Sequence, residues 1–177
     1  MILIVGLGNP GKEYDNTYHN MGFKAIDELS IRNGFLLNKS KCKSEIFEGQ
    51  ILSQKVVVAK PQTYMNLSGE AVVELKNKFK PDKIFIIYDD IDLPLGSFRF
   101  RESGSAGTHN GMRNIVKLLG TQEISRIRIG IKPETEIYDL ADYVLSKCKG
   151  ENLEKVETAI DEAVDFLEDK IKNFKVE

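Results

Sequence analysis

The chain contains only two histidines, and each of them is followed by an asparagine. His19 lies in the polar stretch KEYDNTYHN, where a buried structural role is less natural than on an apolar helix face. The alternative for His19 is a surface or helix-capping histidine. His109 directly precedes a helical pattern, so capping or packing at the start of that helix is its expected role. His19 is therefore the first histidine to consider for proton transfer.

Three acidic residues, Asp89, Asp90 and Asp92, follow the apolar run at residues 83–88. Such a cluster can bind a hard cation, but the sequence offers no second group of ligands, so we expect Asp90 and Asp92 to be solvated loop acids. One of the three beside a histidine would act differently. A carboxylate that accepts the Nδ1 proton fixes the tautomer, leaves Nε2 as the base and stabilises the imidazolium.

Asparagines recur where polar loops follow or separate the apolar runs, at Asn9, at Asn66 in QTYMNLSGE and at Asn110 in GTHNG. Each by itself predicts a cap or a turn, because Asn tolerates left-handed backbone and caps helices. Three amides that converge on one cleft can instead hold a carbonyl, a hydroxyl or an attacking water without competing for the proton of a base. The sequence leaves both interpretations open.

The segment GLGNPG, residues 6–11, satisfies the G-x-G-x-x-G pattern of dinucleotide-binding proteins and follows an apolar run. That motif needs a helix that opens within the glycines, whereas Pro10 and the polar stretch after it predict a loop to about residue 20. The acid expected roughly 20 residues further on would be Asp27 or Glu28, which fall within a helical pattern. Dinucleotide binding is therefore the weaker alternative.

The composition is that of an ordinary globular protein. The 177 residues are 41% hydrophobic and 29% charged, with a formal net charge of -2, which excludes collagen-like, mucin-like and mainly disordered chains. Cys42 and Cys148 stand alone, so neither a disulfide framework nor a zinc site is expected. No apolar run approaches the roughly 18 residues of a membrane span. The opening MILIVGLGNPG lacks a basic leader, and we expect a cytoplasmic protein.

Charge is unevenly distributed along the chain. Residues 94–132 carry 7 basic and 2 acidic side chains, whereas residues 133–177 carry 6 and 13. The acidic end is typical of a solvated helix face, and the basic middle suits an anionic ligand such as a nucleic-acid backbone. Its candidate phosphate contacts, of which we expect half to be merely solvated, are Arg99, Arg101, Arg113, Lys117, Arg126 and Arg128.

The hydrophobic patterns alternate between strands and helices. Strands are predicted at residues 2–7, 46–52, 56–60, 83–88, 98–101 and 126–131, the last with one wet, basic face, and a turn at 53–55 joins the second to the third. Helices are predicted at residues 23–33, ending at Gly34, and at 71–79, 112–119 and 156–174. We therefore expect residues 1–177 to form a single three-layer α/β domain, with a twisted mixed β-sheet flanked by helices and ligands at the carboxyl ends of its strands.

Six motifs occur in order along the chain: GLGNPG, YDNTYHNMG, KPQTYMNLSG, YDDIDLPLG, GTHNGMRNI and RIRIGIK. Together they closely resemble the bacterial peptidyl-tRNA hydrolase family, over most of the chain. The resemblance implies an enzyme that cleaves the ester joining a peptide to the 3′-terminal ribose of tRNA and so recycles prematurely released peptidyl-tRNA. It also implies tRNA as partner, a monomer, and no metal, cofactor or covalent intermediate.

The resemblance also implies roles for individual residues. The family's general base falls on His19, its orienting carboxylate on Asp89, and its discriminating asparagine on Asn9. Contacts to the end of the substrate fall on Tyr14, Tyr64, Asn66 and Asn110, and the positions that hold the 5′ phosphate of tRNA fall on Arg101 and Arg128. The chain departs from many relatives at Tyr88-Asp89-Asp90, where they have His-Asp-Glu, and at Thr108, where they have glycine.

An ester with a ribose hydroxyl as leaving group can be attacked by water, given a base and charge stabilisation. This agrees with a chain that has no credible Ser or Cys nucleophile. Two other classes stay open from the sequence: a dinucleotide-dependent oxidoreductase and a noncatalytic RNA-binding relative. The second has no need of a base and a residue that orients it, which the pair of His19 and Asp89 would provide.

Overall fold

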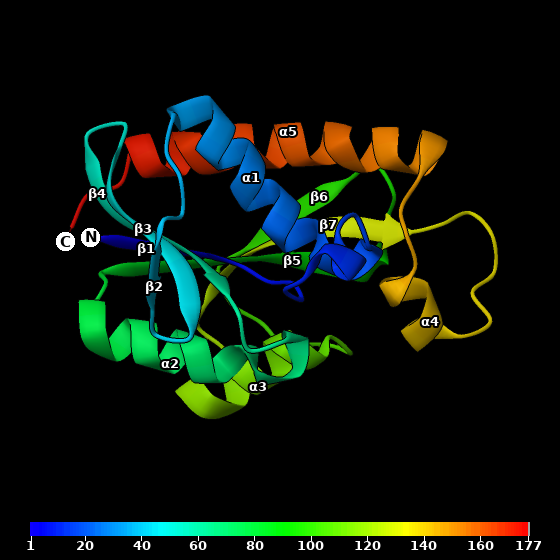
Figure 1. Ribbon diagram of the computed structural model, residues 1–177, viewed down its shortest axis with the longest axis horizontal. Helices are drawn as coiled ribbons and strands as arrows, with labels where there is room; N and C mark the ends of the chain where they lie inside the picture. Colours follow the sequence, from blue (N-terminus) through cyan, green and yellow to red (C-terminus); the bar gives the residue numbers. More distant parts are fainter. Residues whose placement is uncertain (177) are drawn as a thin grey trace.

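The computed structural model describes residues 1–176, which are arranged around one seven-stranded sheet (Figure 1). The strand order across the sheet is β2-β3-β4-β1-β5-β7-β6. The strands are β1 (Ile2–Gly6), β2 (Lys39–Lys41), β3 (Ser44–Ile51), β4 (Gln54–Pro61), β5 (Lys83–Pro94), β6 (Phe98–Arg101) and β7 (Ser125–Lys132). β1 pairs in parallel with β4 and β5, and β5 with β7, while the pairs β2–β3, β3–β4 and β6–β7 are antiparallel. The predicted mixed sheet is confirmed.

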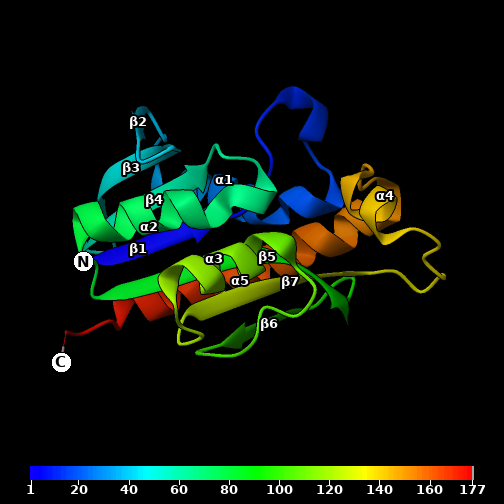
Figure 2. The same ribbon diagram turned by 90° about the horizontal axis from the view of Figure 1, so that it is seen from below.

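Helices cover both faces of the sheet and complete the predicted three layers. They are α1 (Met21–Asn33), α2 (Ser68–Phe79), α3 (Asn110–Leu119), α4 (Leu140–Leu145) and α5 (Gly150–Lys172), with the short 3₁₀ turns η1 (Lys12–Tyr14), η2 (Tyr18–Asn20) and η3 (Met65–Leu67). α1 and α5 pack on one face, and α2 and α3 lie side by side on the other (Figure 2). No helix within residues 1–176 is long and apolar enough to cross a membrane.

The middle strands have long buried apolar stretches, which helices cover on both faces of the sheet. All five residues of β1 are buried, as is expected for a parallel strand covered on both faces. α1 ends as predicted, because Gly34 adopts the left-handed conformation with φ of 66°. β3 and β4 form the predicted hairpin, but its turn is the two-residue Leu52–Ser53, both with positive φ, and not residues 53–55.

β5 is longer than predicted, and this changes the setting of the acids. The strand continues to Pro94, so that Asp89 and Asp90 pair with Ile129 and Gly130 of β7 instead of lying in a loop. The apolar pattern ends at Tyr88, because the next two residues of the strand, Asp89 and Asp90, line a cavity. Two short elements, β2 and α4, were not predicted, because each has too few residues to show a period.

β7 does not have the wet basic face that its alternating pattern predicts. Arg126 is 1% exposed. Its guanidinium donates to the backbone carbonyls of Ile124, Ser105 and Gln122, so all three of its nitrogens are used inside the protein. Arg126 is therefore a structural residue that fixes the surrounding loops, and its prediction as a phosphate contact is wrong.

Candidate active site

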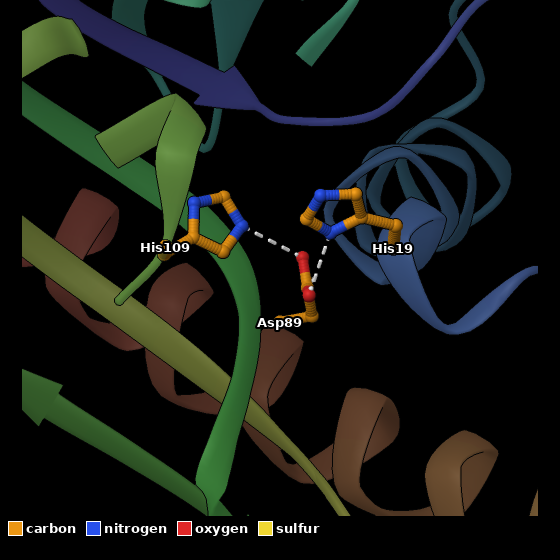
Figure 3. A group of neighbouring side chains, drawn as sticks. All are labelled: His19, Asp89 and His109. Atoms are coloured by element: carbon orange, nitrogen blue, oxygen red, sulfur yellow. Dashed lines mark hydrogen bonds and ion pairs between the residues drawn. The ribbon is translucent and has the colours of Figure 1, made fainter. Parts of the chain in front are cut away.

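The side chains of His19 and Asp89 are in direct contact (Figure 3). His19 Nδ1 lies 2.8 Å from Asp89 Oδ2, and both residues are buried. η2, which follows the loop after β1, carries the histidine, and the adjacent strand β5 carries the acid. The predicted proximity is confirmed. The hydrogen bond uses Nδ1, and Nε2 of His19 has no hydrogen-bond partner among residues 1–176.

His109 is a second imidazole on the same carboxylate, which the sequence did not indicate. Its Nε2 lies 2.9 Å from Asp89 Oδ1, and its Nδ1 accepts the backbone N–H of Met112 at the start of α3. The predicted capping role is thus confirmed. Because Nδ1 must offer a lone pair to the cap, Nε2 carries the ring proton and donates it to Asp89. The only feature of the sequence that could have drawn attention to a role of His109 in the site is that it is one of just two histidines.

Burial opposes charge on both members of the pair, but their attraction outweighs it. Burial of the His19 ring lowers its pKa, whereas the charge of Asp89 and the hydrogen bond to it raise the pKa, and the result lies above the ordinary value for histidine. Burial raises the pKa of Asp89, but His109 and His19 lower it well below the usual range of a carboxyl group. Asp89 is therefore ionised at neutral pH and accepts from both rings.

His19, Asp89 and His109 are also close enough to be considered as a metal site, since their ligand atoms lie within 4.8 Å of one another. A metal needs an unprotonated ring nitrogen directed at it. In His109 the lone pair is on Nδ1 and is used by Met112, while its protonated Nε2 faces the carboxylate. The donor set therefore suits a hydrogen-bonded base more than a metal centre.

Asn9 is held in place by two neighbouring segments. Its side-chain Oδ1 accepts the backbone N–H of Met65 at 2.7 Å. Its own backbone N–H and C=O are hydrogen-bonded to the side chain of Asn20, at 2.8 and 2.9 Å. The position of Asn9 is thus defined relative to η3 and to the turn that carries His19. Asn20 was missed from the sequence, where it is indistinguishable from a helix cap.

A cavity of about 500 Å³ opens beside the pair. Five of the nine predicted site residues line it: His19, Asp89, Asn110, Arg101 and Arg128. The loop at residues 103–109 and α4 form much of its remaining wall. The cavity therefore connects the two parts of the predicted site, the base with its carboxylate and the phosphate-binding arginines.

The other four predicted residues lie outside the lining of this cavity. Tyr14 and Tyr64 pack edge to face, with ring centroids 6.3 Å apart. Tyr64 has the backbone angles φ 63° and ψ 158°, a region that is almost restricted to glycine. Asn66 is exposed on η3, next to the Met65 that Asn9 holds. Tyr64 and Asn66 are therefore connected to Asn9 through the backbone of η3.

The two predicted phosphate-binding arginines differ in their surroundings. Arg101 is exposed on β6. Arg128 donates from Nη1 to Asp90 at 2.7 Å, and the two side chains are 16% and 10% exposed. The prediction that Asp90 is a solvated loop acid is therefore wrong, whereas Asp92 is exposed as expected. A phosphate bound by Arg128 would share it with Asp90.

Comparison with known proteins agrees with this geometry. The family model described as peptidyl-tRNA hydrolase matches residues 3–176. The chain belongs to the peptidyl-tRNA hydrolase family. A peptidyl-tRNA hydrolase of Roseiflexus castenholzii is 50% identical over 171 residues, which are 95% of this chain and 80% of that protein. One of Chloroflexus aurantiacus is 54% identical over 150 residues, 83% and 80% of the two chains. This family member is a hydrolase.

The fold of the hydrolase is also that of a solved relative. The crystal structure of peptidyl-tRNA hydrolase from Acinetobacter baumannii superposes with a TM-score of 0.90 at 33% sequence identity, covering 97% of this chain and 88% of that one. Two of the three glycines of GLGNPG, Gly6 and Gly8, have a packing role here. A Cβ on Gly6 would lie 2.4 Å from the carbonyl oxygen of Gly22, and one on Gly8 2.6 Å from the ring of Phe23. They let α1 approach β1. Because the chain belongs to a family of hydrolases, the oxidoreductase alternative is wrong.

Proposed function

We propose that this hydrolase cleaves the ester bond between a peptide, or an N-blocked amino acid, and the 3′ end of tRNA, with His19 as the general base. One observation carries the proposal: His19 Nδ1 donates to the ionised Asp89, which leaves Nε2 open toward a cleft. In this arrangement Nε2 takes a proton from water, and the carboxylate stabilises the imidazolium that forms. General base action of this kind contributes about 10²–10⁴-fold to the rate.

Neutral amides complete the site in the proposed mechanism. Asn110 lines the same cavity as His19 and is assigned to position the attacking water. Asn66 is the leading side-chain candidate for the oxyanion that develops on the ester carbonyl, and removal of one such donor lowers the rate by about 10²–10³-fold. Neither side chain has a hydrogen-bond partner within the described chain, so both amides are available to the substrate.

Asn9 is assigned to distinguish peptidyl-tRNA from free aminoacyl-tRNA. Its amide engages the blocked end of the substrate, and a neutral amide, unlike a carboxylate, does not attract a free ammonium group. Asn9→Asp is therefore expected to erode the preference for N-blocked substrates. The ratio of cleavage rates for blocked and unblocked aminoacyl-tRNA measures this, and an unchanged ratio counts against the assignment.

The tRNA itself is held through phosphate contacts in the proposal. Arg101 and Arg128 line the same cavity as His19, and phosphate contacts carry no sequence information. We further propose that the chain acts as a single domain, as a monomer and in the cytoplasm.

The decisive test compares the wild-type protein with His19→Ala on an N-acetylated aminoacyl-tRNA. We expect ester cleavage to fall by about 10²-fold or more while tRNA binding is retained. Equal activity of the variant would refute His19 as the base. A wild-type protein that binds tRNA without ester loss would instead favour the noncatalytic RNA-binding alternative.

A further inference from the structure

The side chain of Asn20 does not cap α1, although Asn20 lies at the N-cap position of that helix. At this position Asn normally accepts a hydrogen bond from the first turn of the helix. Its side chain makes no such bond. Instead both ends of the amide are directed at the backbone of Asn9, and Asn20 is only 5% exposed.

The two bonds to Asn9 act as a clamp between loop and turn. Oδ1 of Asn20 accepts the N–H of Asn9 and Nδ2 donates to its carbonyl, so the amide pairs with one residue as a neighbouring strand would. Since Asn20 directly follows His19, the clamp ties the backbone of Asn9 to the residue next to the base. A further bond, from Phe23 N–H to the Leu7 carbonyl, joins the same two segments.

The clamp also bears on which atom of Asn9 meets the substrate. Oδ1 of Asn9 accepts the Met65 N–H, and an N–H donor can be satisfied only by the oxygen of the amide. Nδ2 is then the end that stays free, since it has no partner among the residues described. Asn9 therefore presents a donor, which suits a carbonyl oxygen such as that of an N-acyl group and does not suit an ammonium.

We propose that Asn20 is a positioning residue for substrate discrimination: by holding the backbone of Asn9 it sets where the Nδ2 donor lies relative to His19, and so directs cleavage to substrates with an N-acyl carbonyl. The inference rests on the proposed function and deepens it. Asn20 itself touches neither substrate nor base. Its loss displaces the donor, and a misplaced donor costs the N-acylated substrate more than the free one.

The experiment measures kcat/KM for an N-acetylated aminoacyl-tRNA and for the same aminoacyl-tRNA unblocked. The variants are Asn20→Ala, Asn20→Leu, Asn9→Ala and the double variant Asn9→Ala with Asn20→Ala. Leu fills the same space without hydrogen-bonding groups, which separates the lost bonds from a cavity. Asn33→Ala is the matched control, because Asn33 also donates from its side chain to a backbone carbonyl, that of Leu29, but on the last turn of α1.

We expect both Asn20 variants to lower the ratio of blocked to unblocked kcat/KM by roughly tenfold, and the control to leave it unchanged. The double variant should show no lower ratio than Asn9→Ala, because the two residues act through one donor. An unchanged ratio in the folded Leu variant, beside a lowered ratio in Asn9→Ala, overturns this inference alone. Failure of the wild-type protein to cleave the blocked substrate overturns the proposed function and this inference together.

Discussion

Asp89 Oδ2 lies 2.8 Å from Nδ1 of His19, and the two side chains are 3% and 11% exposed. Seventy residues separate the two along the chain. They meet because β1 and β5 are adjacent parallel strands whose carboxyl ends lie at one edge of the sheet, and the loop after β1 leads to the turn that carries His19. The pair is thus a product of the strand order and not of any local motif.

Asp89→Asn removes the charge of this pair and retains its size. We expect kcat to fall by about 10²-fold or more, because the imidazolium loses its partner and the tautomer is no longer fixed. Since Asp89 is what raises the pKa of His19, the acid limb of the kcat/KM profile should move to lower pH. Asp169→Asn, an exposed acid on α5, is the control. A limb that moves up would contradict the assignment.

The sign of the pH dependence in the wild-type enzyme follows from the same contact. A base must be unprotonated to accept a proton, so activity rises as pH rises through the pKa of His19. Because that pKa is raised, the acid limb should lie above about 6.5, the ordinary value for histidine. A kcat/KM profile measured from pH 5 to 8 checks the position, and a midpoint well below 6.5 would count against His19 as the group that titrates.

His109 allows its two hydrogen bonds to be separated. His109→Asn keeps a good N-cap for α3 but loses the donor to Asp89, whereas His109→Ala loses both. We expect the Ala variant to be less stable than the Asn variant by about 1 kcal/mol. In both variants Asp89 interacts with His19 alone, so the acid limb of kcat/KM should move to higher pH. Denaturant titration and pH profiles provide the two measurements, and an unmoved limb would mean that His109 only caps.

The sequence was sufficient to predict the elements that have a clear hydrophobic pattern. It was not sufficient to predict the contacts between those elements. α5 and β1 have apolar patterns that only one secondary structure explains, and both were predicted. The end of β5 was not, because charge at Asp89 and Asp90 ends the apolar pattern while the backbone pairing with β7 continues. A charged residue in a strand therefore marks where the hydrophobic core ends, but the backbone pairing of the strand can continue past it.

The same limit applies to the polar residues of the site. His19 stood out as a histidine in a polar loop, and the resemblance to the family singled out Asp89 from three neighbouring acids, but Asn20 and His109 have the sequence context of ordinary helix caps. Their distinct partners, Asn9 and Asp89, depend on how η2 and α3 are placed on the sheet. The prediction for Arg126 was wrong in the opposite sense, because a solvated residue was expected and a buried one is found. An alternating basic residue in a strand is expected to face solvent, and the loop carbonyls that accept its hydrogen bonds are not apparent from the sequence.

Asp90 should limit the use of Arg128 for phosphate. Asp90→Asn frees the guanidinium, so tRNA affinity should rise and the slope of log affinity against log salt should steepen by up to about 1. Asp92→Asn removes the same charge from an exposed neighbour without an ion pair among residues 1–176, and it should change the slope less. Arg101→Ala with Arg128→Ala should flatten the slope. Equal effects of the two Asp variants would indicate general electrostatics and no phosphate contact by Arg128.

At position 64 a glycine substitution should give a more stable protein than an alanine substitution, which is the reverse of the usual order. Tyr64→Gly and Tyr64→Ala both lose the ring, but only alanine retains the backbone strain of φ 63° and ψ 158°, which costs about 1–3 kcal/mol. Glycine ordinarily loses about 0.4–1 kcal/mol to alanine through the entropy of the unfolded chain. The net expectation is a Gly variant more stable by about 1 kcal/mol in denaturant titration.

Tyr138 provides the matched comparison for Tyr64, because it is 94% exposed and is not among the residues with positive φ. At this position alanine should be the more stable replacement, as is usual. If glycine is the less stable replacement at both positions, Tyr64 is not strained. The hydrogen bond from Met65 N–H to Asn9 would then follow the conformation of η3 without having to enforce it. A reversal at Tyr64 alone means that the surrounding structure holds this backbone against its preference.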